Sequence, residues 1–170
     1  LITKLVTVGS VLLSGAAAAP KPAPLFYKGH DLSSLKIMEE GGVIYKDTAK
    51  NNETRPAEDI LGDGGMNTVR LRSAHPTHAN TRFEADKGQA WVDPIPGQYD
   101  LAYILDLAKR FASKGYHIYL DYHFSDTWAD PQHNNAPAAW PTTLPELSTT
   151  IRAYVNTTLH AFSAAGVDLS

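Results

Sequence analysis

The chain has 170 residues, of which 43% are hydrophobic and 19% are charged, and its formal net charge is −3. This is the composition of a globular domain. The 15 basic residues are outnumbered by 18 acidic ones and form no basic run, which argues against a nucleic-acid partner. Cysteine is absent, which excludes a disulfide framework, a thiol nucleophile and a cysteine-ligated metal.

The N-terminal stretch has the pattern of a targeting segment. Lys4 precedes an apolar run over residues 5–13, and small residues follow it. This pattern predicts a secretory signal peptide over residues 1–18, with a truncated start because the chain begins at Leu1, and then a short Pro-rich linker over 19–24. A first helix or a buried N-terminal strand is the alternative. The apolar run is too short to span a membrane, so we expect a secreted, extracellular protein with no membrane partner.

Two N-x-[ST] sequons accompany this signal. They predict N-glycosylation at Asn52 and Asn156, which is compatible with secretion but supports it only weakly because such sequons also arise by chance.

The first part of the mature chain predicts one strand–helix–strand unit. An apolar strand is expected over residues 25–30. Pro56 then introduces a helix that runs through residues 57–61 to a pair of glycines at 64–65, and a second strand follows over 66–72.

The same order repeats twice more. A helix over residues 101–112 has apolar side chains at helical spacing and stops before Gly115, a residue suited to the end of a helix. The sequence HIYLDYH, residues 117–123, predicts the next strand. A third helix begins at Pro145 and ends at Gly166, and residues 167–169 look like the opening of another strand.

Alternating strands and helices predict an α/β fold with a parallel sheet. In such folds the chemistry lies at the carboxyl ends of the strands. Polar residues follow three of the predicted strands at that end, at positions 30–31, 70–72 and 121–126. A complete (β/α)₈ barrel needs roughly 250 residues, so we predict the N-terminal part of a TIM barrel, incomplete, with about three βα units over residues 25–170.

These polar stretches also carry a family resemblance, which extends from Tyr27 to Ser170. The matching segments include residues 27–34, 39–46, 65–72, 91–94, 97–101, 121–131 and 137–141. Together they resemble the endo-β-1,4-galactanases of glycoside hydrolase family 53, particularly the secreted fungal enzymes that act on arabinogalactan. The block DYHFSDTWADP, residues 121–131, is the most specific of them.

The resemblance implies endo-hydrolysis of β-1,4-galactosidic linkages in galactan or arabinogalactan. A retaining mechanism of this kind uses two carboxyl groups about 5–5.5 Å apart. In the family both are glutamates at the ends of the fourth and seventh strands, and both would lie beyond Ser170. We therefore expect no catalytic residue and no hydrolysis in these 170 residues alone. We also expect no metal or other cofactor, and a monomer when the enzyme is complete.

The resemblance further implies a substrate-binding role for residues of this chain. Arg70 is expected near the sugar at the cleavage point, where a guanidinium can hold a carboxylate by two parallel hydrogen bonds. A salt bridge at the rim of the sheet is the structural alternative. Arg72 lies on the same side of the strand and is a weaker candidate. The other expected substrate-binding residues are Asp31, Trp91, His123, Asp126 and Trp128.

Each of these candidates also has a structural interpretation. Asp31 could orient another site residue or cap a turn, and Asp126 could cap its own loop. Trp128 offers a flat apolar face to a sugar ring. For Trp140 we expect core packing as readily as sugar stacking.

Two other functions stay open at this point. Asp121, His123 and Asp126, with His30 and His133, could form the metal site of a barrel hydrolase, although no tight metal-binding spacing is present. A non-catalytic carbohydrate-binding remnant is the second possibility, although an incomplete barrel would expose strand edges and aggregate.

Residues 73–90 do not fit the family pattern. They show neither helical nor strand periodicity and fall in a loop that should lead towards the substrate. They are either a real insertion or, as we expect, an unspliced intron translated in frame.

Overall fold

The computed structural model of the chain describes residues 26–74, 97–126, 129, 131–132 and 134–169. Its main feature is a parallel sheet of three strands in the order β1-β4-β5. These strands are β1 (Gly29–Asp31), β4 (Thr68–Ala74) and β5 (His117–His123). The predicted signal peptide and linker lie outside the described residues.

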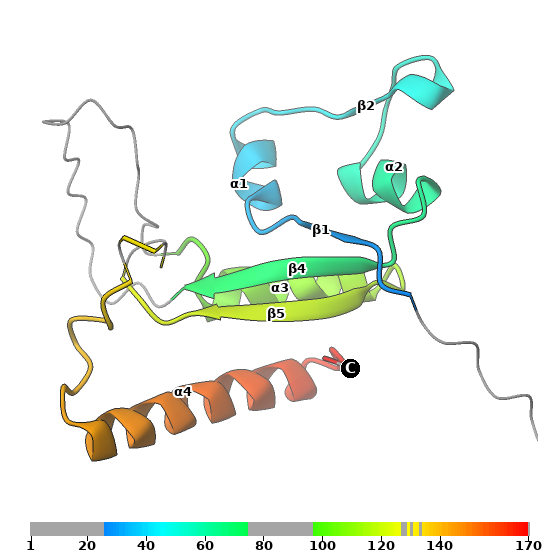
Figure 1. Cartoon of the computed structure of the whole chain (residues 1–170). Coiled ribbons are helices and arrows are strands. Elements are labelled where there is room, and N and C mark those ends of the chain that lie inside the picture. Colours follow the sequence, from blue (N-terminus) through cyan, green and yellow to red (C-terminus); the bar gives the residue numbers. More distant parts are fainter. Residues whose placement is uncertain (1–25, 75–96, 127–128, 130, 133, 170) are drawn as a thin grey trace, which may run out of the picture.

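Helices and a small hairpin surround this sheet (Figure 1). In chain order they are α1 (Leu35–Glu40), β2 (Lys46–Asp47), the 3₁₀-helix η1 (Thr48–Lys50), β3 (Glu53–Thr54), α2 (Ala57–Asp63), α3 (Leu101–Ala112) and α4 (Leu144–Ala164). Strands β2 and β3 pair antiparallel. None of the helices in the described ranges is long and apolar enough to cross a membrane.

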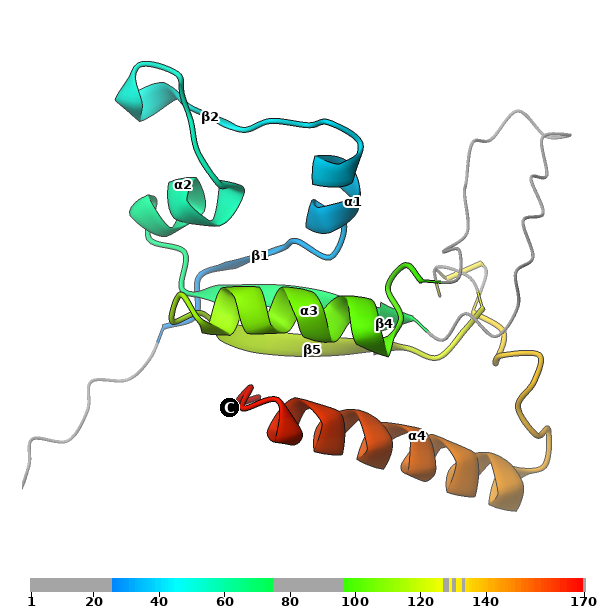
Figure 2. The same ribbon diagram turned by 180° about the vertical axis from the view of Figure 1, so that it is seen from behind.

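Helix α3 covers one face of the sheet. It lies behind β4 and β5 in Figure 1 and in front of them in Figure 2, the view from the opposite side. Val69 and Leu71 of β4 are fully buried, as are Ile104 and Phe111 of α3. Side chains alternate across a strand, so the residues of β4 that alternate with Val69 and Leu71 belong to the other face of the sheet.

A cluster of charged side chains joins α1, α2 and α3. Arg110 of α3 donates two hydrogen bonds to Glu39, at 2.7 and 2.8 Å, and two to Glu58, both at 2.8 Å. Lys114 lies 3.3 Å from Glu58, whose side chain is only 2% exposed. Burial raises the pKa of Glu58, but the hydrogen bonds and charge of Arg110 outweigh it and leave that pKa below its ordinary value of 4.5. We call these four residues the Arg110 cluster.

The predicted helices and strands are largely confirmed, with two corrections at strand ends. The N-terminal strand, expected over residues 25–30, is formed only over Gly29–Asp31 in the described part. The side chain of Asn67 accepts a hydrogen bond from Lys28 N and donates one to Phe26 O, both at 2.8 Å. Lys28 O accepts from the backbone N–H groups of Asn67 and Thr68, at 2.9 and 3.1 Å, so backbone contact with β4 begins at Lys28 although the strand begins at Gly29. Strand β4 begins two residues later than predicted and continues through Ser73 and Ala74, into the segment 73–90.

The strand expected at residues 167–169 is wrong for the residues described. The backbone N–H of Val167 donates to Phe162 O at 3.0 Å and so completes the end of α4. Its side chain is 6% exposed and packs into the core. Met66 and Tyr116 make the corresponding bonds to Leu61 O and Phe111 O just before β4 and β5, so residues 167–169 leave their helix as those strands do but pair with no strand within the described residues.

Candidate substrate-binding site

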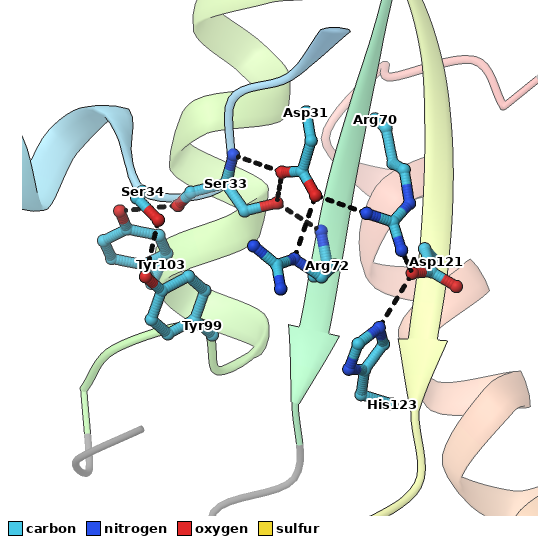
Figure 3. A network of polar contacts seen from close by, with 9 residues as sticks. All are labelled: Asp31, Ser33, Ser34, Arg70, Arg72, Tyr99, Tyr103, Asp121 and His123. Atoms are coloured by element: carbon cyan, nitrogen blue, oxygen red, sulfur yellow. Dashed lines mark hydrogen bonds and ion pairs between the residues drawn. The ribbon is translucent and has the colours of Figure 1, made fainter. Parts of the chain in front are cut away.

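Polar side chains gather on the face of the sheet that α3 leaves open. They come from all three parallel strands and from the turn after β1 (Figure 3). We call this set the Arg70 network, and its members are Asp31, Ser33, Arg70, Arg72, Asp121 and His123. Parallel strands in register bring these residues together although they are far apart in sequence.

Arg70 lies between two carboxylates. Asp31 is directly opposite it on β1, and Asp121 is two residues beyond its partner position on β5. The Nη1 atom of Arg70 donates to Asp31 Oδ2, and its Nη2 atom donates to Asp121 Oδ2. A guanidinium has five N–H donors, so within the described residues these two bonds leave donors for a ligand. The Arg70 side chain is 37% exposed.

Asp31 is engaged on both of its oxygens. Oδ1 accepts hydrogen bonds from the backbone N–H and the hydroxyl of Ser33, and Oδ2 lies 2.9 Å from Nε of Arg72 in addition to its bond with Arg70. Burial raises the pKa of Asp31, but the Ser33 hydrogen bonds and the charges of Arg72 and Arg70 outweigh it and hold the pKa below its ordinary value of 3.8. Asp31 is therefore an anion at neutral pH that caps its own turn and bonds both arginines.

The turn after β1 is fixed to β4 and α3. The hydroxyl of Ser33 accepts a hydrogen bond from Arg72 N at 2.8 Å, and Ser33 O accepts one from the hydroxyl of Tyr103 at 2.9 Å. Ser34 and Tyr99 share a hydrogen bond of 2.8 Å between their hydroxyls. Burial raises the pKa of Tyr103 to about 12. This turn holds Asp31 against the two arginines.

His123 joins the network at the end of β5. Its Nε2 atom lies 2.9 Å from Asp121 Oδ2, the oxygen that also accepts from Arg70. A carboxylate can only accept, so Nε2 carries the hydrogen in this contact. The His123 side chain is 16% exposed.

The remaining sequence candidates are distributed differently. Asp126 Oδ2 accepts a hydrogen bond from Ala138 N at 2.7 Å, so the side chain ties its own loop to a later one. Trp128 and Trp91 lie outside the described residues. Trp140 is 8% exposed and packs against Phe124 and Tyr154, which supports the core-packing alternative.

Both predicted glycosylation positions are exposed. Asn52 follows η1 in a left-handed backbone conformation (φ 60°), and Asn156 lies on α4. Across the described ranges, no three His, Asp, Glu or Cys side chains are grouped to hold a metal ion.

Asp121 and Ser33 are the members of the network that the sequence analysis does not propose as substrate-binding residues; Asp121 entered it only in the polar stretch 121–126 and as a possible metal ligand. The spacing holds one signal for Asp121. Asp121 precedes His123 by two residues, which places both side chains on the same face of a strand. Its position beside Arg70, however, depends on the register of β4 against β5, which a single sequence does not display.

Comparison with known proteins identifies the family. The family model described as glycosyl hydrolase family 53 matches residues 27–170. The chain belongs to this family. Its curated relatives include a probable arabinogalactan endo-beta-1,4-galactanase A of Aspergillus fumigatus, 39% identical over 149 residues. They also include the arabinogalactan endo-beta-1,4-galactanase A of Aspergillus niger, 44% identical over 132 residues.

This family 53 chain spans about a third of the length of those relatives. The matches cover 87% of the chain but 36% of the A. fumigatus protein, and 78% of the chain but 32% of the A. niger protein. Among solved structures, a fungal beta-1,4-galactanase is 35% identical with a TM-score of 0.70, over 86% of this chain and 39% of that one. The Ignisphaera aggregans GH53 catalytic domain is 29% identical with a TM-score of 0.69, over 84% and 37%.

These similarities confirm the predicted fold. The described residues form part of a family 53 barrel, with three parallel strands and their helices but no closed barrel. They also confirm the resemblance on which the glycosidase interpretation rests.

Proposed function

We propose that this chain supplies part of the substrate-binding wall of a secreted endo-β-1,4-galactanase that cleaves galactan or arabinogalactan with retention of configuration. The single observation that supports this most is Arg70, held between two carboxylates on the open face of the sheet in a family 53 chain. Both catalytic glutamates belong, on this proposal, to a part of the barrel that the 170 residues do not include.

The chemistry of the network fits binding better than proton transfer. A retaining glycosidase needs one carboxyl group that keeps its proton near neutral pH, which requires a raised pKa. The pKa of Asp31 is lowered, and Asp121 bonds the cation of Arg70. Both carboxylates can accept hydrogen bonds and balance charge, and the lowered pKa makes Asp31 a poor general acid.

Arg70 is the member best suited to contact the reacting groups. Its N–H donors beyond the two used in the network can bind a sugar hydroxyl or hold the carboxylate of the nucleophile. On this proposal His123 and Asp126 bind sugar hydroxyls and Asp31 supports Arg70. Trp91 and Trp128 offer aromatic faces to the pyranose rings.

The proposal also covers the setting of the protein. The signal-like start and the exposed sequons at Asn52 and Asn156 support secretion and glycosylation. The partner is a galactan polysaccharide, bound by a monomer that needs no cofactor.

The test separates binding from hydrolysis. The full chain should migrate more slowly in native gels that contain β-1,4-galactan, and it should release no reducing ends. A chimera that joins residues 27–170 to the remainder of the A. niger enzyme should release oligosaccharides whose first-formed anomer is β by NMR. Arg70→Ala in the chimera should lower kcat/KM at least tenfold, whereas Lys50→Ala, at an exposed ion pair with Asp63, should not.

Three outcomes would contradict this. A folded chimera without galactanase activity would refute the enzymatic role, and if that inactive chimera were still retarded by galactan, a non-catalytic carbohydrate-binding protein would be favoured instead. An α-anomer as first product would refute retention. Hydrolysis by the 170 residues alone would show that the catalytic pair is already present.

A further inference from the structure

We infer that Asp121 is a positioning residue: one of its carboxylate oxygens fixes Arg70 and His123 together, as a unit that presents both side chains to the bound galactan. The inference rests on the proposed function for its substrate, but its geometric half stands on contacts within this chain.

The first step is that a single atom serves both side chains. Asp121 Oδ2 accepts from Nη2 of Arg70 and from Nε2 of His123, at 2.9 Å for the histidine. An oxygen with two charge-assisted or polar donors fixes the angle between them, because each donor aligns with the same acceptor. Figure 3 shows the guanidinium and the ring converging on this oxygen.

The second step is that the two strands contribute differently. Arg70 comes from the central strand β4 and is already held on its other side by Asp31 of β1. Asp121 and His123 both come from β5, two residues apart and on one face. Asp121 therefore connects the two side chains: among the described contacts, it is the one that links the orientation of His123 to that of Arg70.

The third step is that the side chain of Asp121 is partly buried, which strengthens its hydrogen bonds. Its side chain is 23% exposed and that of His123 is 16% exposed, so both bonds are partly shielded from water. Hydrogen bonds to charged groups in such settings contribute more than exposed ion pairs do. Removing the carboxylate would leave Asp31 as the acceptor for Arg70 among the described residues, and it would take this acceptor from His123.

The experiment uses the full 170-residue chain and two NMR signals. One is the Nε2–H proton of His123, assigned by its loss in His123→Gln, and the other is the Nη–H group of Arg70. Both should be visible in the wild type, because a carboxylate acceptor slows their exchange with water. Asp121→Asn should remove or shift both signals together, whereas Asp106→Asn, at an exposed surface pair with Lys36, should change neither.

A second measurement connects the geometry to the sugar. The dissociation constant for β-1,4-linked galactotetraose, measured by titration, should rise about tenfold in Asp121→Asn and stay within twofold in Asp106→Asn. If Asp121→Asn does not fold, Asp121→Glu keeps the charge and moves it by one methylene. It should then keep the backbone spectrum but shift both side-chain signals and weaken sugar binding.

The outcomes separate this inference from the proposed function. Unchanged His123 and Arg70 signals in a folded Asp121 variant would overturn the positioning role. Signals that respond as expected in a chain that binds no galactotetraose would uphold the positioning and refute the galactan-binding wall. Wild-type affinity in variants that have lost both signals would show that the orientation of these side chains does not serve binding.

Discussion

Replacing Arg110 with methionine should destabilise the protein far more than its partly exposed position suggests. Arg110 donates four hydrogen bonds and joins three helices, and the Glu58 side chain it holds is 2% exposed. After Arg110→Met, the nearest remaining cation to Glu58 among the described residues is Lys114, at 3.3 Å.

The magnitude follows from the buried carboxylate of Glu58 that loses its main partner. Removing one partner of a buried ion pair costs about 3–5 kcal/mol. The Arg110 side chain is 32% exposed and Lys114 remains, so we expect a loss of about 2–3 kcal/mol in the free energy of unfolding. With a urea dependence of about 2 kcal/mol per molar, the unfolding midpoint followed by circular dichroism should fall by about 1–1.5 M.

The lowered pKa of Glu58 predicts how this stability difference changes with pH. The pKa of Glu58 in the folded protein lies below its ordinary value of 4.5. Its contribution is therefore present in full above pH 4.5 and is lost as the pH falls through the lowered value. The difference between wild type and Arg110→Met should be greatest near pH 7 and should shrink in acid.

The matched control is Lys50→Met, which removes an exposed ion pair with Asp63 at 2.9 Å. Such pairs contribute about 0–1 kcal/mol. If Arg110→Met and Lys50→Met had equal midpoints at pH 7, the argument from the burial of Glu58 would be refuted.

Four further predictions concern the sheet, the turn after β1 and the segment between β4 and α3. Gly29→Ala would place a Cβ atom 2.5 Å from a β4 carbonyl oxygen, and thermal unfolding should show a loss of about 1–3 kcal/mol. Tyr103→Phe removes the hydrogen bond to Ser33 O and should cost about 1 kcal/mol in urea unfolding; an absorbance titration should also lose one phenol that ionises near pH 12. Asp31→Asn should lower the urea midpoint at pH 7, and its difference from wild type should close as the pH falls below 3.8, because the folded-state pKa is lowered. Sequencing of the mature transcript should show that the codons for residues 73–90 are absent, and a peptide from that segment in the secreted protein would contradict the intron hypothesis.

Local signals in the sequence were enough to place the helices and strands whose ends are marked by a capping residue or a glycine turn. The helix at 101–112 has the predicted bounds because Asp100 caps its start, accepting from Tyr103 N at 2.9 Å, and the chain turns at Gly115 after its end. Helix α1 and the β2–β3 hairpin were not predicted. A six-residue helix shows little periodicity, and the Ser34 side chain at its start makes no capping hydrogen bond.

The candidate site was predictable to the extent that strand ends meet at one rim. The rule that parallel strands end at one edge of the sheet places Asp31, Arg70 and His123 at the same edge from the sequence alone. It could not supply Asp121 as the partner of Arg70, because the pairing depends on which residues of β4 and β5 stand side by side. It also could not show that Asp126 bonds the backbone of Ala138, since that contact depends on the path of a loop.

The connections at the two ends of the sheet differ in length, and this has a consequence for how family 53 sequences can vary. Residues 64–67 and 113–116 link helix to strand in four-residue turns, each with a left-handed glycine, Gly65 or Gly115. Of the links from strand to helix, residues 32–34 after β1 form a short turn, whereas residues 75–100 after β4 and 124–143 after β5 are several times longer. An inserted or deleted residue in a short turn would slide a strand against its neighbour and turn Arg70 or Asp121 away from the open face. Changes in chain length among relatives should therefore collect in the links after β4 and β5, where they leave the strand register intact and, on the proposed function, would alter the surface offered to the sugar.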